Sequence, residues 1–142
     1  MYGRFGLAGE PGTELRGWTL SGPTRPGDAP ELTLIWHALG RQNRNWMVFI
    51  HLVDAQEQIV AEDNRPPQDA AFPMLQWVAG DWIEDRHPLT LPANLAPGEY
   101  HIRVGLFYPR TDRRAGVYSK RGTLRGDYLD IGSMIVTERG GS

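Results

Sequence analysis

The chain has 142 residues, of which 23% are charged, and its formal net charge is −2. This length fits one domain with its own core, and the near-neutral charge excludes a general attraction to nucleic acid or to anionic membranes. The lack of cysteine excludes a disulfide framework and thiol chemistry. No apolar run approaches the ~20 residues that span a bilayer, and the N-terminus lacks the apolar segment of a signal peptide. We therefore expect a soluble domain at 1–142, with its core over 14–137. The terminal Arg-Gly-Gly-Ser is typical of a linker, so the domain is expected to be one part of a longer protein.

Short apolar segments alternate with Pro and Gly along the whole chain, which predicts many strands and no long helix. Residues 63–80 are rich in Pro and predict an irregular connection with one helical turn at most. About eight strands at this spacing favour an all-β, antiparallel sandwich of about 7–9 strands, of the immunoglobulin or fibronectin type III kind. A closed barrel is the alternative. The predicted strands are Glu14–Leu20, Glu31–Leu39, Asn45–Val53, Gln58–Glu62, Asp81–Leu91, Glu99–Tyr108, Gly116–Ser119 and Tyr128–Val136.

The strongest strand follows a turn at Pro97 and Gly98 and begins close to Tyr100. Pro fixes φ and Gly accepts a positive φ, so the pair suits a tight turn. A Tyr at the start of such a strand buries its ring and returns its hydroxyl to the backbone a few residues upstream, as in a tyrosine corner. We interpret Tyr100 as structural.

The outward side of two neighbouring strands is unusually apolar. If Asn45–Val53 lies beside Glu99–Tyr108, one outer face collects Phe49, His51, Val53, His101, Arg103 and Phe107. Either the connection at 63–80 or another domain covers this face, or it is an interaction face for a partner. His51 and His101 as cross-strand neighbours would also suit a metal ion, but no third ligand is evident.

The segment LQWVAGDWIEDRH at 75–87 combines two Trp residues with acidic residues. Exposed Trp beside carboxylates is one way in which β-sandwich modules hold a sugar ring. The candidate carbohydrate-binding residues are Trp77, Trp82, Asp81 and Asp85. The alternative is that Trp77 caps the core and Trp82 packs under a loop.

Other chemistry has weaker support. A calcium site or a glycosidase carboxylate pair could be formed by Asp63, Asp81, Glu84 and Asp85. Their spacing is not that of an EF-hand, and the sequence does not give the separation of the carboxylates. Residues 110–125 form a basic hairpin tip that suits either phosphate contact or plain solvation. No catalytic motif is present. We therefore expect no catalytic residue, no metal and no cofactor.

The order of these elements resembles the soluble β-sandwich domain at the C-terminal end of some bacterial polytopic membrane glycosyltransferases, of the protein-mannosyltransferase-like class. The resemblance covers Leu15 to Val136, with departures at Glu57, where Gly is expected, and at Ala115, where a larger apolar residue is expected. The segments that carry it are Leu15-Arg16-Gly17-Trp18, Pro26-Gly27-Asp28, Leu32 to Trp36, Val48 to Asp54, Asp63 to Pro66, Trp77 with Gly80-Asp81 and Asp85, and Pro97 to Phe107.

This resemblance implies an extracytoplasmic accessory domain without catalytic groups of its own, because that family's catalytic carboxylates lie in membrane-embedded parts. The expected partner is a neighbouring domain of the same polypeptide or a glycan. The alternatives are a purely structural spacer without a ligand and a small stand-alone hydrolase. Kinship of fold does not by itself decide between them.

Overall fold

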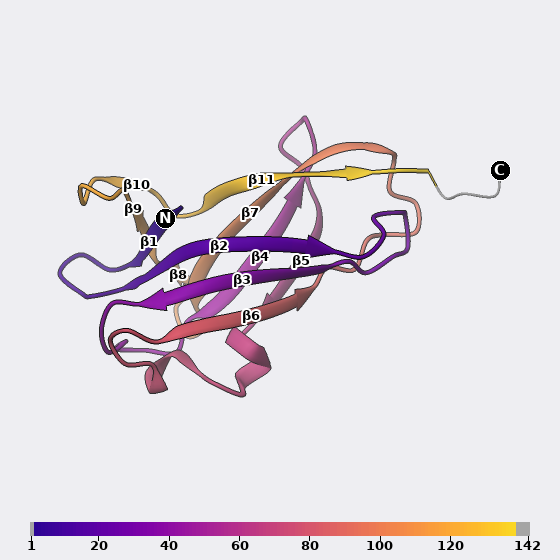
Figure 1. The fold of residues 1–142 in the computed structure, drawn as a ribbon. Coiled ribbons are helices and arrows are strands. Elements are labelled where there is room, and N and C mark those ends of the chain that lie inside the picture. Colours follow the sequence, from indigo (N-terminus) through magenta and orange to yellow (C-terminus); the bar gives the residue numbers. More distant parts are fainter. Residues whose placement is uncertain (1, 139–142) are drawn as a thin grey trace.

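Two antiparallel sheets make up the structure, a computed structural model that describes residues 2–138 (Figure 1). Sheet A runs in the order β10 (Leu124–Gly126), β9 (Gly116–Tyr118), β1 (Gly3–Gly6), β2 (Thr13–Ser21), β3 (Glu31–Ala38) and β6 (Trp82–Pro88). Sheet B runs in the order β11 (Leu129–Val136), β7 (Gly98–Tyr108), β4 (Met47–Val53) and β5 (Ile59–Arg65), with β8 (Arg113–Arg114) also paired to β7. The prediction of an all-β, two-sheet architecture is confirmed. The proposed linker at 139–142 lies outside the described residues.

Each predicted strand corresponds to an observed one. β6 ends at Pro88, as expected of a residue that cannot donate to a ladder. β5 extends to Arg65, beyond the predicted end at Glu62. The sequence did not predict β1, β8 and β10, which have four, two and three residues and too little alternation to be detected.

The connection between β5 and β6 holds two short 3₁₀ turns, η1 (Pro67–Ala70) and η2 (Met74–Gln76). Its hydrogen bonds reach the edge of sheet A, where the backbone N–H of Gln68 donates to Asp85 Oδ1. It therefore packs against β6 and not over the outer face of sheet B, so the expectation that 63–80 covers that face is wrong. Among residues 2–138, no helix has the length and apolar character needed to cross a bilayer.

The core lies between the two sheets, and strand alternation supplies it. Alternate residues of β3 (Leu32, Leu34, Trp36 and Ala38) are fully buried, and so are Val48, Ile50 and Leu52 of β4. Phe5 of the unpredicted strand β1 meets Trp36 edge to face, with ring centroids 5.3 Å apart. Each large apolar side chain buried in this way contributes about 1.5–3 kcal/mol.

Two turns show how the local sequence shapes the strands. The hydroxyl of Tyr100 donates to the carbonyl of Ala96 at 2.6 Å, which is the geometry expected of the corner, and Gly98 before it has a φ of 147°. In the β4–β5 hairpin, Glu57 has a φ of 64°, the left-handed conformation for which Gly was expected. Asp54 supports that turn by accepting from the N–H groups of Gln56 and Gln58, each at 2.9 Å.

Candidate functional site

The four residues proposed for a sugar site do not form one site. Trp77 is fully buried, and its indole N–H donates to the carbonyl of Phe72 at 2.9 Å. A ring without exposed surface cannot stack on a ligand, so the prediction that Trp77 binds carbohydrate is wrong. Trp77 instead turns from the β5–β6 connection into the core.

Asp85 is also fully buried, so the prediction that it binds a ligand is wrong as well. Its Oδ2 atom accepts from the indole N–H of Trp36 at 3.2 Å and lies 2.6 Å from Nε2 of His87. Its Oδ1 atom accepts from the backbone N–H of Gln68 at 2.7 Å. Alternation along β6 turns Asp85 and His87 toward the core, and both carboxylate oxygens are used inside the protein.

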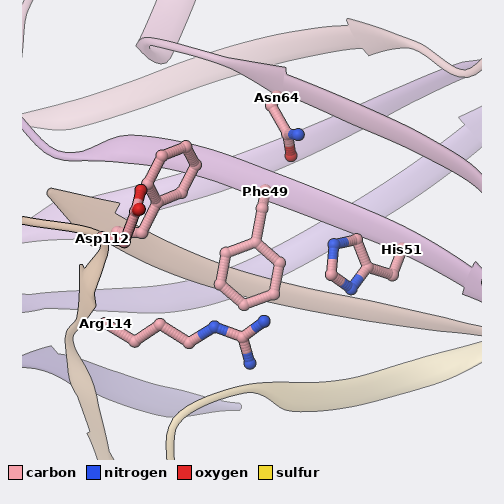
Figure 2. A pocket seen from close by; sticks show the side chains of 6 residues that line it. Phe49, His51, Asn64, Asp112 and Arg114 are labelled. Atoms are coloured by element: carbon pink, nitrogen blue, oxygen red, sulfur yellow. The ribbon is translucent and has the colours of Figure 1, made fainter. Parts of the chain in front are cut away.

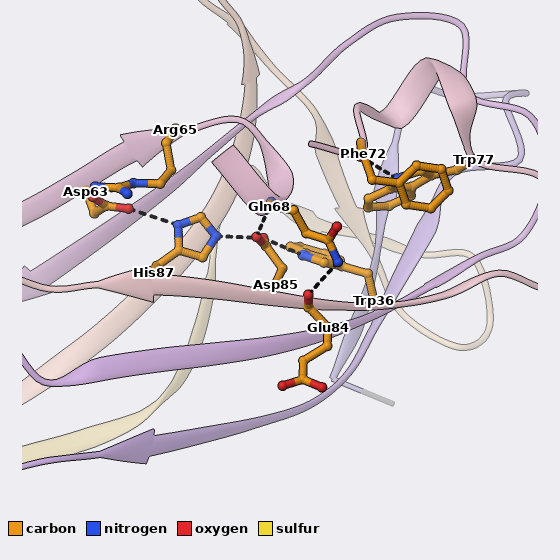
Figure 3. A network of polar contacts seen from close by, with 9 residues as sticks. All are labelled: Trp36, Asp63, Arg65, Gln68, Phe72, Trp77, Glu84, Asp85 and His87. Carbon is orange, nitrogen blue, oxygen red and sulfur yellow. Dashed lines mark hydrogen bonds and ion pairs between the residues drawn. The ribbon is translucent and has the colours of Figure 1, made fainter. Parts of the chain in front are cut away.

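His87 is the centre of this buried polar network (Figure 3). Its second ring nitrogen, Nδ1, lies 2.9 Å from Asp63 Oδ2, and Asp63 Oδ1 accepts from Arg65 Nη2 at 2.8 Å. Burial by itself lowers the pKa of His87, but hydrogen bonds and charge from Asp85 and then Asp63 outweigh it and raise the pKa above the ordinary value. Each ring nitrogen therefore faces a carboxylate, an arrangement that favours the protonated form of the imidazole.

This network also bears on the hypotheses of a metal site and of a carboxylate pair. Among residues 2–138, no group of three or more acidic or His side chains has an arrangement that could hold a metal ion. Asp63 and Asp85 are both buried and both bind His87, so neither carboxylate is placed to meet a substrate.

Trp82 is the aromatic residue of the segment that faces solvent. It is 58% exposed on the outer side of β6, opposite His37 of β3. The His37 ring stacks on the indole with centroids 4.2 Å apart and planes 19° apart, and the guanidinium of Arg16 lies 5.5 Å from the same indole. Asp81 beside it is a turn residue, because its Oδ2 atom accepts from the backbone N–H of Val78 at 2.9 Å.

A hollow of about 420 Å³ lies at the same edge of sheet A, lined by Gln68, Asp69, Glu84 and Arg86. Glu84 and Arg86 follow Trp82 on the outward side of β6, and Arg86 Nη2 pairs with Glu84 Oε1 at 2.9 Å. Gln68 and Asp69 come from η1, where both residues have left-handed φ values of 51° and 53°. Non-glycine residues in this conformation are strained, and such strain often accompanies binding sites.

The outer face of sheet B assembles as the sequence indicated. β4 lies beside β7, with Phe49 opposite Gly105 and His51 opposite Arg103. His101 lies opposite Val53, so His51 and His101 are not directly paired, which weakens the metal-pair hypothesis. Phe107 lies opposite Met47 at the far end of this face.

Side chains of neighbouring elements, and not the 3₁₀ turns of the 63–80 connection, contact this face. Phe49 and Val53 are each only 2% exposed, and the guanidinium of Arg114 lies 4.4 Å from the Phe49 ring centroid. Arg103 pairs with Glu57 and lies 4.8 Å from the Tyr128 ring, while His101 Nδ1 lies 3.3 Å from Asp130 Oδ2.

A second hollow, of about 260 Å³, remains on this face (Figure 2). Burial lowers the pKa of His51 at its wall; Glu62 acts in the opposite direction, and Arg114 and Arg103 lower it further.

Sequence reasoning missed several residues that the structure places at these sites. The alternation of Trp82, Glu84 and Arg86 was a readable signal, because residues two apart on a strand share a face. His37 and Arg16 needed the register between strands, and Gln68 needed the shape of η1, for which no sequence pattern existed.

No protein-family model matches this chain, and a search of curated proteins found no significant match either.

Proposed function

We propose that this chain is a non-catalytic binding module that holds a carbohydrate against Trp82. The observation that carries the proposal is an indole that is 58% exposed, held in place by a stacked His37 ring, on a strand whose next outward residues line a hollow. The site differs from the one expected from the sequence, since Trp82 is retained but Trp77 and Asp85 are not part of it.

The physical basis is the complementarity between an indole and the apolar face of a sugar ring. An exposed aromatic ring gains by covering the C–H face of a sugar, and polar groups nearby take the hydroxyls. The His37 stack restricts the rotamers of Trp82, which lowers the entropy lost when a ligand binds. Hydrogen-bond donors and acceptors for these hydroxyls lie next to Trp82 along the same edge of the sheet. They are the side chains of Glu84, Arg86 and Gln68.

For the fold type, we propose the fibronectin type III-like arrangement. What supports it is the strand order β2-β3-β6 in one sheet against β11-β7-β4-β5 in the other, together with the corner at Tyr100. β1, β9 and β10 then extend sheet A beyond the common arrangement.

For the context, we propose an accessory domain on the extracytoplasmic side of a bacterial membrane glycosyltransferase. The sequence resemblance supports this part. Reading the coding DNA upstream of Met1 tests it, with the expectation of apolar segments of ~20 residues in the same frame. An upstream stop codon directly before a ribosome-binding site would contradict it.

The binding test is a glycan array probed with the wild-type chain, Trp82→Ala and the matched control Tyr128→Ala. Tyr128 is also an exposed aromatic residue, at 41%, but it lies directly before β11, an edge strand of sheet B. We expect wild type and Tyr128→Ala to bind the same glycans and Trp82→Ala to lose them, since the variant lacks the apolar surface on which the sugar ring would stack. Equal loss in both variants, or retention in Trp82→Ala, would contradict the proposal.

A structural packing domain is the second candidate, and specific observations favour it. Trp77 is buried in the core, and Phe49 and Val53 on the outer face of sheet B are 2% exposed. An absence of binding across the whole array, by a chain with a cooperative unfolding transition, would favour this candidate over the first.

A further inference from the structure

The hollow on the outer face of sheet B is separate from Trp82, which lies on sheet A. It is lined by Phe49, His51, Asn64, Phe107, Asp112 and Arg114, which come from β4, β5, β7, β8 and the turn before β8. Figure 2 shows Asn64, His51 and Arg114 arranged around the Phe49 ring. The half-buried Phe107 supplies apolar surface and the other exposed walls are polar, a mixed lining that suits a small ligand.

The floor of the hollow is a stack of three groups. Gly105 lies opposite Phe49, and a Cβ at Gly105 would lie 2.0 Å from the Phe49 Cζ atom. The missing Cβ lets the Phe49 ring lie directly on the strand, where it is 2% exposed. The Arg114 guanidinium then lies over the ring, 4.4 Å from its centroid.

This stacking orients Arg114 for a ligand. A guanidinium held over an aromatic ring keeps the N–H groups in its own plane available, and their fork matches carboxylate and phosphate oxygens. Among residues 2–138, the structure gives Arg114 one side-chain hydrogen bond, to Asp127 Oδ1, and at 3.4 Å it is long. Most of the donor capacity of Arg114 is therefore unused inside the protein.

The other polar residues of the lining suit the uncharged part of a ligand whose anionic group binds Arg114. Burial disfavours the charged form of His51, and a neutral imidazole has one donor and one acceptor; its Nε2 atom lies 3.6 Å from Glu62 Oε2. Asn64 adds an amide, and the Asp112 carboxylate accepts from hydroxyls but repels a bare anion. A hollow of about 260 Å³ suits a single ring.

We propose that this hollow binds an anionic sugar, with Arg114 holding its carboxylate or phosphate group and Asp112, Asn64 and His51 contacting its hydroxyls. The shared chemistry is an oxyanion on a hydroxylated ring. Glucuronate and glucose 6-phosphate carry it in two forms, while glucose lacks the anion and inorganic phosphate lacks the ring.

The experiment is an NMR titration of the whole chain with each of these four compounds, following backbone amides of β4, β5 and β8. We expect glucuronate, glucose 6-phosphate or both to shift these amides at lower concentration than glucose or phosphate. Arg114→Gln is expected to weaken that binding by about tenfold or more, because it removes a charge-assisted bidentate contact. Arg113→Gln, next to it on β8 and absent from the lining, is the matched control and should bind as wild type.

Asn64→Ala is a second variant, at an exposed position on β5 opposite Phe49, and it should weaken binding because it removes the side-chain amide. Dispersed spectra for each variant show that it is folded. The proposal is overturned if no anionic sugar shifts these amides in wild type, if glucose binds as well as glucuronate and glucose 6-phosphate do, or if Arg114→Gln and Arg113→Gln behave alike. It concerns residues other than those of the Trp82 site, so either proposal can fail alone.

Discussion

The Nε2 atom of His87 lies 2.6 Å from the Oδ2 atom of Asp85, and both side chains are fully buried. The other ring nitrogen of His87 reaches Asp63 on β5. β6 is an edge strand of sheet A and β5 is an edge strand of sheet B. The His87 imidazole therefore connects the two sheets where these two edge strands face each other. This connection has consequences that can be measured.

Replacing His87 with Gln should destabilise the fold strongly. The change leaves the buried Asp85 carboxylate with neutral donors alone, whereas Asp63 keeps Arg65. Breaking a buried ion pair in this way costs about 3–5 kcal/mol. The measurement is urea unfolding followed by Trp fluorescence. His101→Gln is the control, because that side chain is 48% exposed and its loss should have little effect. Similar stability of the two variants would show that the network contributes little.

Stability should also depend on pH with opposite signs for two histidines. The folded-state pKa of His87 is raised, so its contribution is complete below the unfolded value of about 6.5 and is lost as pH rises through the folded pKa. The folded-state pKa of His51 is lowered, so its contribution is complete above about 6.5 and is lost as pH falls through the folded pKa.

Urea midpoints measured from acid to alkaline pH check this sign pattern. The decline of stability on the alkaline side should disappear in His87→Gln, and the part of the acid decline that belongs to His51 should disappear in His51→Gln. An alkaline decline that survives in His87→Gln would assign it to another group.

Tyr100→Phe should lower the free energy of unfolding by about 1–2 kcal/mol, because the carbonyl of Ala96 loses its donor. The ring itself is retained, so packing should change little. Tyr128→Phe, at an exposed position, serves as the control in the same denaturation series. If the two Tyr variants match wild type, the hydroxyl of Tyr100 is not a stabilising contact.

Gly105→Ala should destabilise by about 1–3 kcal/mol, the usual effect of overpacking. The new Cβ would lie 2.0 Å from Phe49 Cζ, and the ring is too buried to move aside without disturbing Arg114. A double-mutant cycle with Phe49→Leu measures the coupling. Additive effects of the two changes would mean that the ring does not rest on Gly105.

The sequence predicted most of the fold because alternation and turn chemistry are local signals. Leu32, Leu34 and Trp36 alternate in an unmistakable way, and the corner at Tyr100 depends on residues only four positions apart. Glu57 shows the limit of turn rules, since a left-handed φ is reached there without Gly.

The candidate sites could be predicted only in part, because they depend on long-range register and on irregular backbone. Trp77 and Trp82 are five residues apart in one segment, yet one is buried and the other is exposed. The difference arises because Trp77 ends the 3₁₀ turn η2, whereas Trp82 begins β6 on its outward side. Arg114 belongs to a two-residue strand, and no pattern in the sequence places it on Phe49.

The turn at η1 has one more consequence, for behaviour in concentrated solution. A strand at the margin of a sheet normally displays backbone groups that a foreign strand can pair with, which leads to aggregation. Here the side-chain amide of Gln68 donates to the carbonyl oxygen of Glu84 at 2.8 Å, so one of those acceptors on β6 is already occupied. The neighbouring Glu84 and Arg86 side chains add charge along the same margin. The η1 turn therefore hinders the strand of another molecule from pairing with β6, the edge strand of sheet A.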